Sequence, residues 1–194
     1  MTRKLAPLLA EVRACAVCAP HLPHGVRPVV QLAPGARLVI VGQAPGARVH
    51  ASGVPWDDDS GARLRDWTGL DPAAFYDAGR VALLPMGFCY PGKGASGDLP
   101  PRPECAPLWH DRLMALLPAR RLLLLVGIHA QERYLAGKRA KTLTETVRNF
   151  RTYGPDCFPL PHPSWRSTGW MKRNPWFAAD VLPALRQAVG DAMS

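Results

Sequence analysis

The stretch RLVIVG at residues 37–42 is followed at once by the loop QAPG at residues 43–46. Two similar apolar runs come later in the chain, VALLPM at 81–86 and LLLLVG at 122–127, and a weaker one covers residues 157–160. Short continuous apolar runs are typical of strands that are buried on both faces of a mostly parallel sheet. The sequence therefore predicts an α/β fold.

Helix-like segments separate the apolar runs, as this fold requires. The expected helices cover residues 61–68, 103–117, 128–135, 143–150 and 175–189. Pro103 and Pro175 suit the first turn of a helix, because the first N–H groups of a helix have no internal partner. Ligands of open parallel sheets bind beyond the carboxyl ends of the strands. The Gly- and Pro-rich loops after residues 42, 87 and 160 are therefore the expected place for a functional site.

Length and charge narrow the class of protein. A chain of 194 residues, 47% of them hydrophobic, is expected to form one domain over residues 1–194. Lys and Arg outnumber Asp and Glu by 24 to 15, which gives a net charge of +9 and favours binding to polyanions. Nucleic acid is the first partner to consider, and a basic surface that only interacts with solvent is the alternative.

No segment of the sequence resembles a membrane anchor. The apolar run near the N-terminus is interrupted by Pro7 and Glu11, and no stretch approaches the roughly 20 apolar residues of a membrane span. We therefore expect a cytoplasmic protein with no membrane partner. In that reducing compartment, cysteines serve as metal ligands, buried apolar groups or catalysts more often than as disulfides.

The five cysteines divide into a set of four and one other. Cys15 and Cys18 form a C-x-x-C pair, whose sulfurs can converge on one metal, and Cys89 and Cys105 lie beside Pro-rich backbone. Four thiolates bind either Zn²⁺ or an iron-sulfur cluster, and the ligand type does not decide between them. Cys157 lies in an expected strand and is interpreted as a packed core thiol. Five free buried thiols are the third possibility.

A second loop adds weight to the first. His162-Pro163-Ser164 follows the fourth expected strand and leads through Trp165 and Arg166 to Lys172 and Arg173. Aromatic side chains interleaved with cations can reach into DNA and bind its phosphates. A single histidine is usually structural, so a functional role for His162 is supported only together with the loop at residues 43–46.

Together, the two loops resemble the motifs of the uracil-DNA glycosylase superfamily. GQAPG at residues 42–46 is similar to its first motif, and His162-Pro163-Ser164 is similar to its second. The closest resemblance is to the iron-sulfur branch called family four. That branch has C-x-x-C near the N-terminus, a cysteine after the second strand and another some fifteen residues later. The segment at residues 53–56 (GVPW) also resembles the G-x-P-F loop of this branch.

The resemblance implies a fold, a cofactor and an activity. It implies a three-layer α/β/α sandwich with a central four-stranded parallel sheet. It implies a 4Fe-4S cluster, with zinc as the alternative, that is structural or positions DNA. The metal ligands that it implies are Cys15, Cys18, Cys89 and Cys105. The implied activity is excision of uracil or a related deaminated base from DNA in base excision repair, by a monomer.

The resemblance also implies roles for single residues. His162 would donate a hydrogen bond to the departing base, Gln43 would position base or water, and Asp58 would orient water or stabilise the cationic sugar. The implied substrate-binding residues are Gly42, Ala44, Trp56 and Cys89. The implied DNA-binding residues are Ser164, Trp165, Arg166, Lys172 and Arg173. A core position for Trp56, and a helix-capping role for the acidic run at residues 57–59, are the structural alternatives.

Two positions depart from the family-four pattern. Gln43 stands where that branch usually has glutamate, and Pro85 stands where it has a uracil-reading asparagine. Hypoxanthine, xanthine or another damaged base is therefore also a possible substrate. Two other classes of protein stay open, a damage-binding protein of the same fold with weak turnover and a zinc-stabilised module with no role on nucleic acid.

Overall fold

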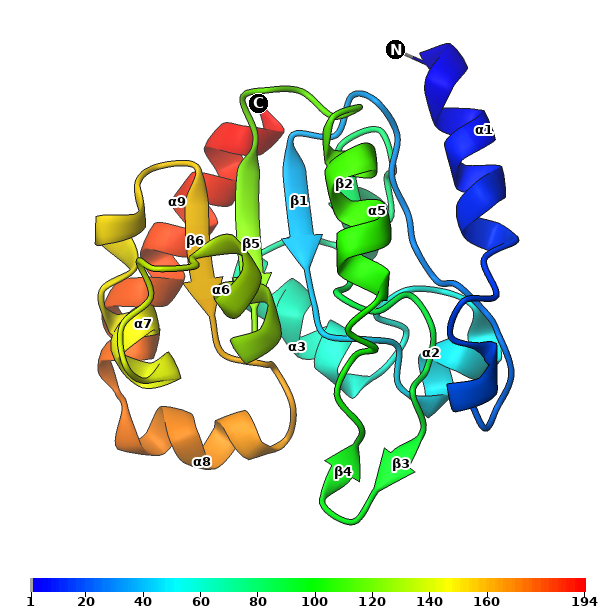
Figure 1. Ribbon diagram of the computed structural model, residues 1–194. Helices are drawn as coiled ribbons and strands as arrows, with labels where there is room; N and C mark the ends of the chain where they lie inside the picture. Colours follow the sequence, from blue (N-terminus) through cyan, green and yellow to red (C-terminus); the bar gives the residue numbers. More distant parts are fainter. Residues whose placement is uncertain (1) are drawn as a thin grey trace.

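A four-stranded parallel sheet in the order β2-β1-β5-β6 forms the middle layer of the computed structural model, which describes residues 2–194 (Figure 1). Its strands are β1 (Leu38–Val41), β2 (Val81–Leu83), β5 (Leu122–Val126) and β6 (Cys157–Leu160). Leu38 of β1 lies level with Val81 of β2 and with Leu122 of β5. All four strands fall within the predicted apolar runs.

Both faces of the sheet are buried, which is why the strands read as continuous apolar runs. In β1, Leu38 and Ile40 belong to one hydrophobic cluster, while Val39 and Val41 belong to another on the opposite face. All four side chains are completely buried. The period of two that marks a half-exposed strand is therefore absent from the sequence, because both sets of alternate side chains pack against helices.

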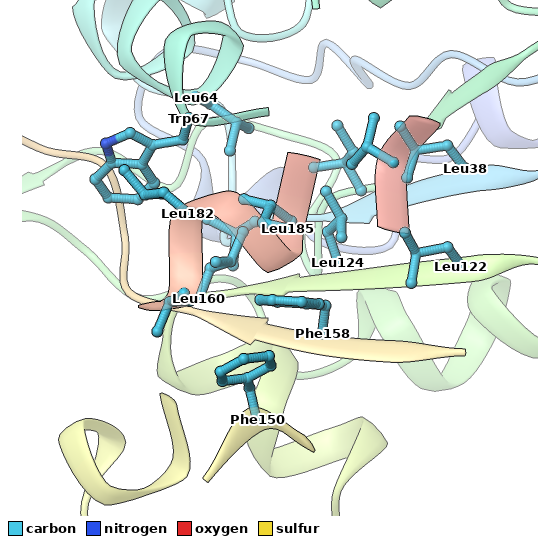
Figure 2. Close-up of a cluster of buried hydrophobic side chains, with 14 of the residues drawn as sticks. Leu38, Leu64, Trp67, Leu122, Leu124, Phe150, Phe158, Leu160, Leu182 and Leu185 are labelled. Atoms are coloured by element: carbon cyan, nitrogen blue, oxygen red, sulfur yellow. The ribbon is translucent and has the colours of Figure 1, made fainter. Parts of the chain in front are cut away.

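Helices cover the sheet on both sides and complete the predicted three-layer α/β/α sandwich. One face packs against α3 (Asp59–Thr68) and α9 (Leu182–Met193), and Figure 2 shows Leu64, Trp67 and Leu185 meeting the sheet there. The opposite face packs against α1 (Thr2–Arg13), α5 (Cys105–Met114) and α6 (Ile128–Tyr134). The other elements are the helices or turns η1 (Ala19–His21), α2 (Ala47–Ser52), α4 (Pro72–Phe75), α7 (Leu143–Arg148), η2 (Phe150–Tyr153), α8 (Arg166–Arg173) and the π-helical η3 (Phe177–Val181), and a hairpin of β3 (Lys93–Gly94) and β4 (Gly97–Asp98).

Several predicted boundaries are wrong for identifiable reasons. β2 ends at Leu83 because Pro85 has no N–H, although Leu84 and Met86 still donate to the carbonyls of Ile40 and Gly42 at 2.9 Å. Pro103 precedes the first residue of α5 by two positions, and Pro175 precedes η3 in the same way. Helices α1 and α8 were not predicted, because Pro7 interrupts the first and Gly169 weakens the second.

The carboxyl ends of all four strands face one edge of the sheet. In Figure 1 the strand arrows point toward this edge, where α2, α8 and the β3–β4 hairpin lie. The loops after β1, β2 and β6 therefore surround one region, as the parallel arrangement requires.

A buried histidine joins the helical layer to the loop after β2. His110 of α5 is completely buried, with Nε2 2.9 Å from the Pro85 carbonyl oxygen and Nδ1 2.7 Å from the Tyr134 hydroxyl oxygen. Because a carbonyl can only accept, Nε2 carries the proton, and Nδ1 of the neutral ring accepts from Tyr134. Burial lowers the pKa of His110 to about 4.

This burial predicts an acid-sensitive stability. Between pH 6.5 and 4 the unfolded His110 binds a proton and the folded one does not, so stability is lost as the pH falls through this range. Across this range, His110 lowers the free energy of unfolding by about 3 kcal/mol. Denaturant unfolding at pH 7 and pH 4.5 checks it, with His110→Gln expected to show a shallower pH dependence than the parent. His129→Gln, at a side chain that is 30% exposed, is the matched control. Equal pH dependence in the parent and His110→Gln would contradict the assignment.

Candidate active site

A cavity of about 510 Å³ lies at the carboxyl edge of the sheet. Its wall is formed by the loop after β1, the segment before α3, the β3–β4 hairpin and the loop after β6. Its size suits a small organic group such as a nucleobase. The cavity lies where the sequence predicted a functional site.

The two predicted motif loops meet in this cavity. Gln43 and His162 both line it, and both lie against Gly127 at the end of β5. A β-carbon on Gly127 would be 3.5 Å from Gln43 Cγ and 3.6 Å from His162 Cβ. Gly127 also has a φ of +89°, which favours glycine. Both distances are ordinary van der Waals contacts, so the backbone conformation and not a lack of space favours glycine here, and Gln43 and His162 lie on either side of this position.

His162 is a neutral hydrogen-bond donor in this setting. Burial lowers its pKa to about 4, and the charge of Asp98 opposes that shift. The ring is therefore uncharged near pH 7 and carries a single N–H. A neutral donor held in the cavity wall suits the stabilisation of negative charge on a leaving group.

Trp56 forms the wall beside His162. The two rings are stacked with their centroids 6.0 Å apart and their planes at 29°. A base placed between two parallel rings needs about 7 Å, twice a van der Waals contact of about 3.5 Å. No base fits between the two rings as they stand, so a bound base would contact them from the open side of the cavity.

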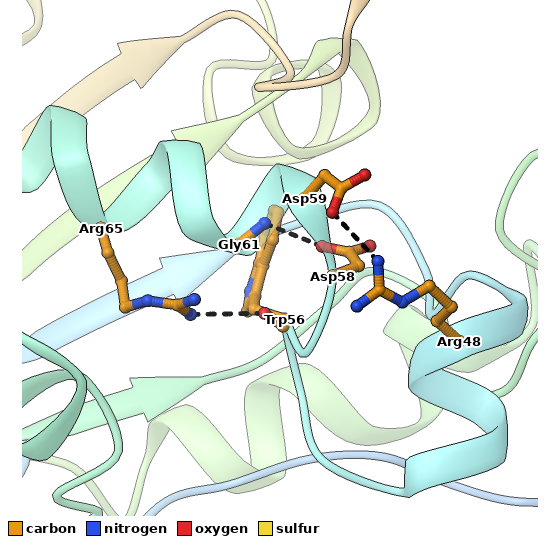
Figure 3. Close-up of polar contacts among 6 residues, drawn as sticks. All are labelled: Arg48, Trp56, Asp58, Asp59, Gly61 and Arg65. Carbon is orange, nitrogen blue, oxygen red and sulfur yellow. Dashed lines mark hydrogen bonds and ion pairs between the residues drawn. The ribbon is translucent and has the colours of Figure 1, made fainter.

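The backbone of Trp56 is held in an unusual conformation. Its φ of 59° lies in the left-handed region, and its carbonyl accepts from Arg65 at 3.4 Å (Figure 3). The same carbonyl accepts from the Tyr76 hydroxyl at 3.3 Å. Only glycine fits at position 61, because a β-carbon there would be 1.8 Å from the Trp56 carbonyl oxygen. A β-carbon on Gly42 would be 2.7 Å from the Trp56 ring. The ring thus packs on the backbone beside Gln43 as well as against the core.

Of the three consecutive aspartates, only Asp58 lines the cavity. Its Oδ1 accepts from the backbone N–H of Gly61 at 2.8 Å, so it caps α3, and burial raises its pKa. Asp59 is exposed and pairs with Arg48 at 3.0 Å, and Asp57 is exposed as well (Figure 3). The capping and cavity-lining interpretations of the acidic run therefore both apply to Asp58.

A second carboxylate in the cavity, Asp98, was not predicted. It lies at the end of β4 in the insertion that follows β2, and its Oδ1 accepts from the Tyr90 hydroxyl at 3.3 Å. The available signal was its position, because the insertion follows a strand whose carboxyl end lies at the predicted site.

The predicted DNA-binding residues divide into two groups. Ser164, Trp165 and Arg166 line the cavity, and the Trp165 side chain is 74% exposed. The Arg166 guanidinium lies 4.9 Å from the centre of the Trp165 ring and donates to the Ser96 carbonyl at 2.7 Å. Lys172 and Arg173 are exposed at the end of α8, outside the cavity.

Position 85 gives the cavity wall little hydrogen-bonding capacity. Pro85 lines the cavity and has neither an N–H nor a polar side chain. Its carbonyl accepts from His110 on the helical side. This part of the wall therefore offers a ligand no side-chain hydrogen bond, unlike the asparagine of the family-four pattern.

The model of the uracil DNA glycosylase superfamily matches residues 29–186. The chain belongs to this superfamily. Membership indicates DNA glycosylase activity, a hydrolase chemistry, with DNA as the substrate. The matched part of the chain contains Gln43, Trp56 and His162. Within residues 2–194, no helix is long and apolar enough to cross a membrane.

The four cysteines of the predicted ligand set line a second cavity of this superfamily member. Cys15, Cys18, Cys89 and Cys105 come together there, although the first two precede the matched residues. Cys89 therefore lies with the other thiols and not in the cavity of Gln43 and His162, where it was also predicted. The free space among the thiols, about 20 Å³, has room for about one water molecule.

Burial favours the neutral form of the thiols in the cysteine cavity. It raises the pKa of Cys105 to about 12, and the Phe88 N–H donates to its Sγ at 3.3 Å. Burial also raises the pKa values of Cys18 and Cys89, with the charge of Glu104 adding to the shift of Cys18 and neighbouring cysteines adding to that of Cys89. Among the described residues, 2–194, no group of three or more His, Cys, Asp or Glu side chains is arranged to hold a single metal ion.

Cys157 lies apart from the other four cysteines, on β6. Its side chain packs against the cluster on the α5 side of the sheet, and burial raises its pKa to about 11. It is therefore a packed thiol within a strand, as predicted.

Proposed function

We propose that this superfamily member excises uracil, or a related deaminated base, from DNA by hydrolysing the N-glycosidic bond. The observation that carries the proposal is the meeting of Gln43 and His162 in one cavity beside the Trp56 ring. A base inside a duplex cannot reach such a cavity, so the nucleotide must rotate out of the helix.

The residues of the cavity suit the charges that develop during bond cleavage. Negative charge builds on the departing base, and the neutral His162 ring donates a hydrogen bond to it without giving up its proton. The Gln43 amide has both donors and an acceptor, so it can orient the base or a water molecule. Trp165 and Arg166 at the mouth support a role in filling the gap left in the duplex and in binding phosphate.

The choice of base rests mainly on Gln43. Pro85 leaves one wall of the cavity without a side-chain hydrogen bond, and an amide can present either its oxygen or its nitrogen to the base. Uracil, hypoxanthine and xanthine all carry carbonyl and N–H groups that an amide can read. We propose uracil as the principal substrate and the two purines as secondary ones.

A panel of damaged oligonucleotides tests the proposed function. Each labelled strand carries one uracil, hypoxanthine or xanthine, is presented single- and double-stranded, and is treated with alkali after incubation to cleave abasic sites. We expect alkali-labile product from uracil and less from the purines. Undamaged strands of the same sequence are the control, and absence of product from every damaged strand would contradict the proposal.

We further propose that Cys15, Cys18, Cys89 and Cys105 hold a 4Fe-4S cluster, as in the family-four branch. The order and spacing of these cysteines resemble those of the family-four branch, and the four thiols line one cavity, which supports the cluster, with zinc as the alternative. The thiols would have to turn outward to hold it, since the space among them is small. When bound, the cluster supplies a covalent cross-link between the N-terminal segment and the start of α5.

One observation favours a second function, damage binding with weak turnover. Gln43 stands at the motif position where family four usually has glutamate, and an amide cannot accept a proton. A damage-binding protein of this fold would retain salt-sensitive binding to abasic or uracil-containing DNA without releasing base. A gel shift at several ionic strengths, run beside the excision panel, separates the two functions.

A further inference from the structure

Hydrolysis in this cavity needs a group that Gln43 cannot replace. The attacking water must lose a proton, and the sugar carries positive charge as the base departs. A carboxylate meets both needs. Two carboxylates line the cavity, Asp58 and Asp98, and both approach Gly46 in the loop after β1. A β-carbon on Gly46 would be 3.3 Å from Asp98 Oδ2 and 4.0 Å from Asp58 Oδ2.

The two carboxylates differ in their burial and in the hydrogen bonds that they accept from the protein. Asp58 is partly buried and caps α3 through the Gly61 N–H. Asp98 is exposed, and one of its oxygens accepts from the Tyr90 hydroxyl. Among residues 4–194, no hydrogen bond to its Oδ2 is present. Asp98 is therefore the carboxylate with an oxygen available to water or substrate.

The hairpin holds Asp98 at the cavity. Asp98 lies opposite Lys93 in the β3–β4 pair, and the hairpin tip is fixed by the bond from Arg166 to the Ser96 carbonyl. Asp98 is also the charged group that acts on His162. The titratable or charged groups around Asp98 are Asp58, Tyr90, Lys93, His162 and Arg166.

We propose that Asp98 is the catalytic carboxylate that orients and deprotonates the attacking water, an inference that rests on the proposed function. The water oxygen forms a bond to C1′ of the sugar while the bond from C1′ to the base nitrogen breaks. The electron pair of that bond leaves with the base, to which His162 donates a hydrogen bond. The proton of the water passes to the Asp98 carboxylate and then to solvent, and the base anion takes a proton from solvent. The products are the free base and an abasic sugar with a hydroxyl at C1′.

Asp98→Asn tests this role, because asparagine keeps an oxygen for the Tyr90 hydroxyl but cannot take a proton. We expect the single-turnover excision rate on the best base of the panel to fall about 100-fold or more. DNA affinity and melting temperature should stay close to those of the parent. Asp98→Glu should recover part of the rate. The dependence of the rate on pH in the acid range should differ between Asp98→Asn and the parent. Asp191→Asn, at an exposed carboxylate of α9, is the matched control.

Each outcome of this experiment bears on the inference. A rate in Asp98→Asn within about threefold of the parent would overturn the role of Asp98 and leave the proposed function intact. If Asp98→Asn lowers the melting temperature and the DNA affinity along with the rate, and Asp98→Glu recovers none of them, Asp98 has a structural role in the hairpin. That outcome would also overturn the catalytic role. A parent that excises no base at all would overturn the proposed function and, with it, the role of Asp98.

Discussion

His162→Ala is expected to lower the single-turnover rate of base excision by about 100-fold or more. The neutral ring is held against Gly127 and Trp56, so its N–H is already oriented when charge develops on the base. Removing such a fixed donor leaves that charge without its hydrogen-bond partner. Affinity for damaged DNA should change much less, because phosphate contacts supply most of it.

Single-turnover kinetics on the best base of the panel would measure this effect, with DNA affinity and melting temperature measured in parallel. His129→Ala is the matched control, since His129 lies on α6 outside the cavity and its side chain is partly exposed. His162→Gln, which retains an N–H donor, should lose less activity than His162→Ala. Excision at the parent rate by His162→Ala would remove His162 from the mechanism.

Cys105→Ser is expected to remove the proposed 4Fe-4S cluster and destabilise the protein. Burial raises the pKa of Cys105 to about 12, and Cys105 is the first residue of α5, so its replacement removes a ligand of the proposed set that is fixed by a helix. A ligand held at a thousand times its dissociation constant stabilises the folded state by about 4 kcal/mol. For a domain of this size that corresponds to roughly 8 to 16 °C in melting temperature.

Iron and sulfide content, absorbance near 400 nm and thermal unfolding of the anaerobically purified protein are the measurements. Cys157→Ser is the matched control, because Cys157 packs on β6 away from the other four cysteines. It should keep the iron content of the parent even if it loses some packing energy. Zinc in place of iron in the parent would contradict the proposed cluster, and full iron content in Cys105→Ser would rule out the proposed ligand set.

The strands and layers of the fold were predictable, because they depend on local apolar runs. Residues 37–42 contain β1, and burial on both faces produces its unbroken apolar pattern. Helices α1 and α8 were not predictable in this way. α1 is identified by the burial of Leu5, Leu8 and Val12 against a partner that the local sequence does not specify. α8 contains Gly169, a weak helix former, and its formation depends on tertiary contacts.

The same division applies to the candidate site. The approach of Gln43 to His162 follows from parallel strands, whose carboxyl ends share an edge, so the loop motifs located it from sequence. Asp98 is different, because it reaches the cavity through a hairpin fixed by Tyr90 and by a bond from Arg166 to Ser96. These contacts join residues up to 70 positions apart, and no local pattern encodes them.

The left-handed backbone at Trp56 limits how the pocket can be redesigned. Most side chains resist this conformation, whereas asparagine and glycine adopt it readily. Replacing Trp56 by asparagine would preserve the path of the loop into α3. It would also remove the indole from the cavity wall and so make room for bulkier damaged bases. A β-branched residue such as valine would instead distort the chain before it changed the shape of the pocket. Variants that broaden substrate range should therefore be sought among replacements that tolerate this turn.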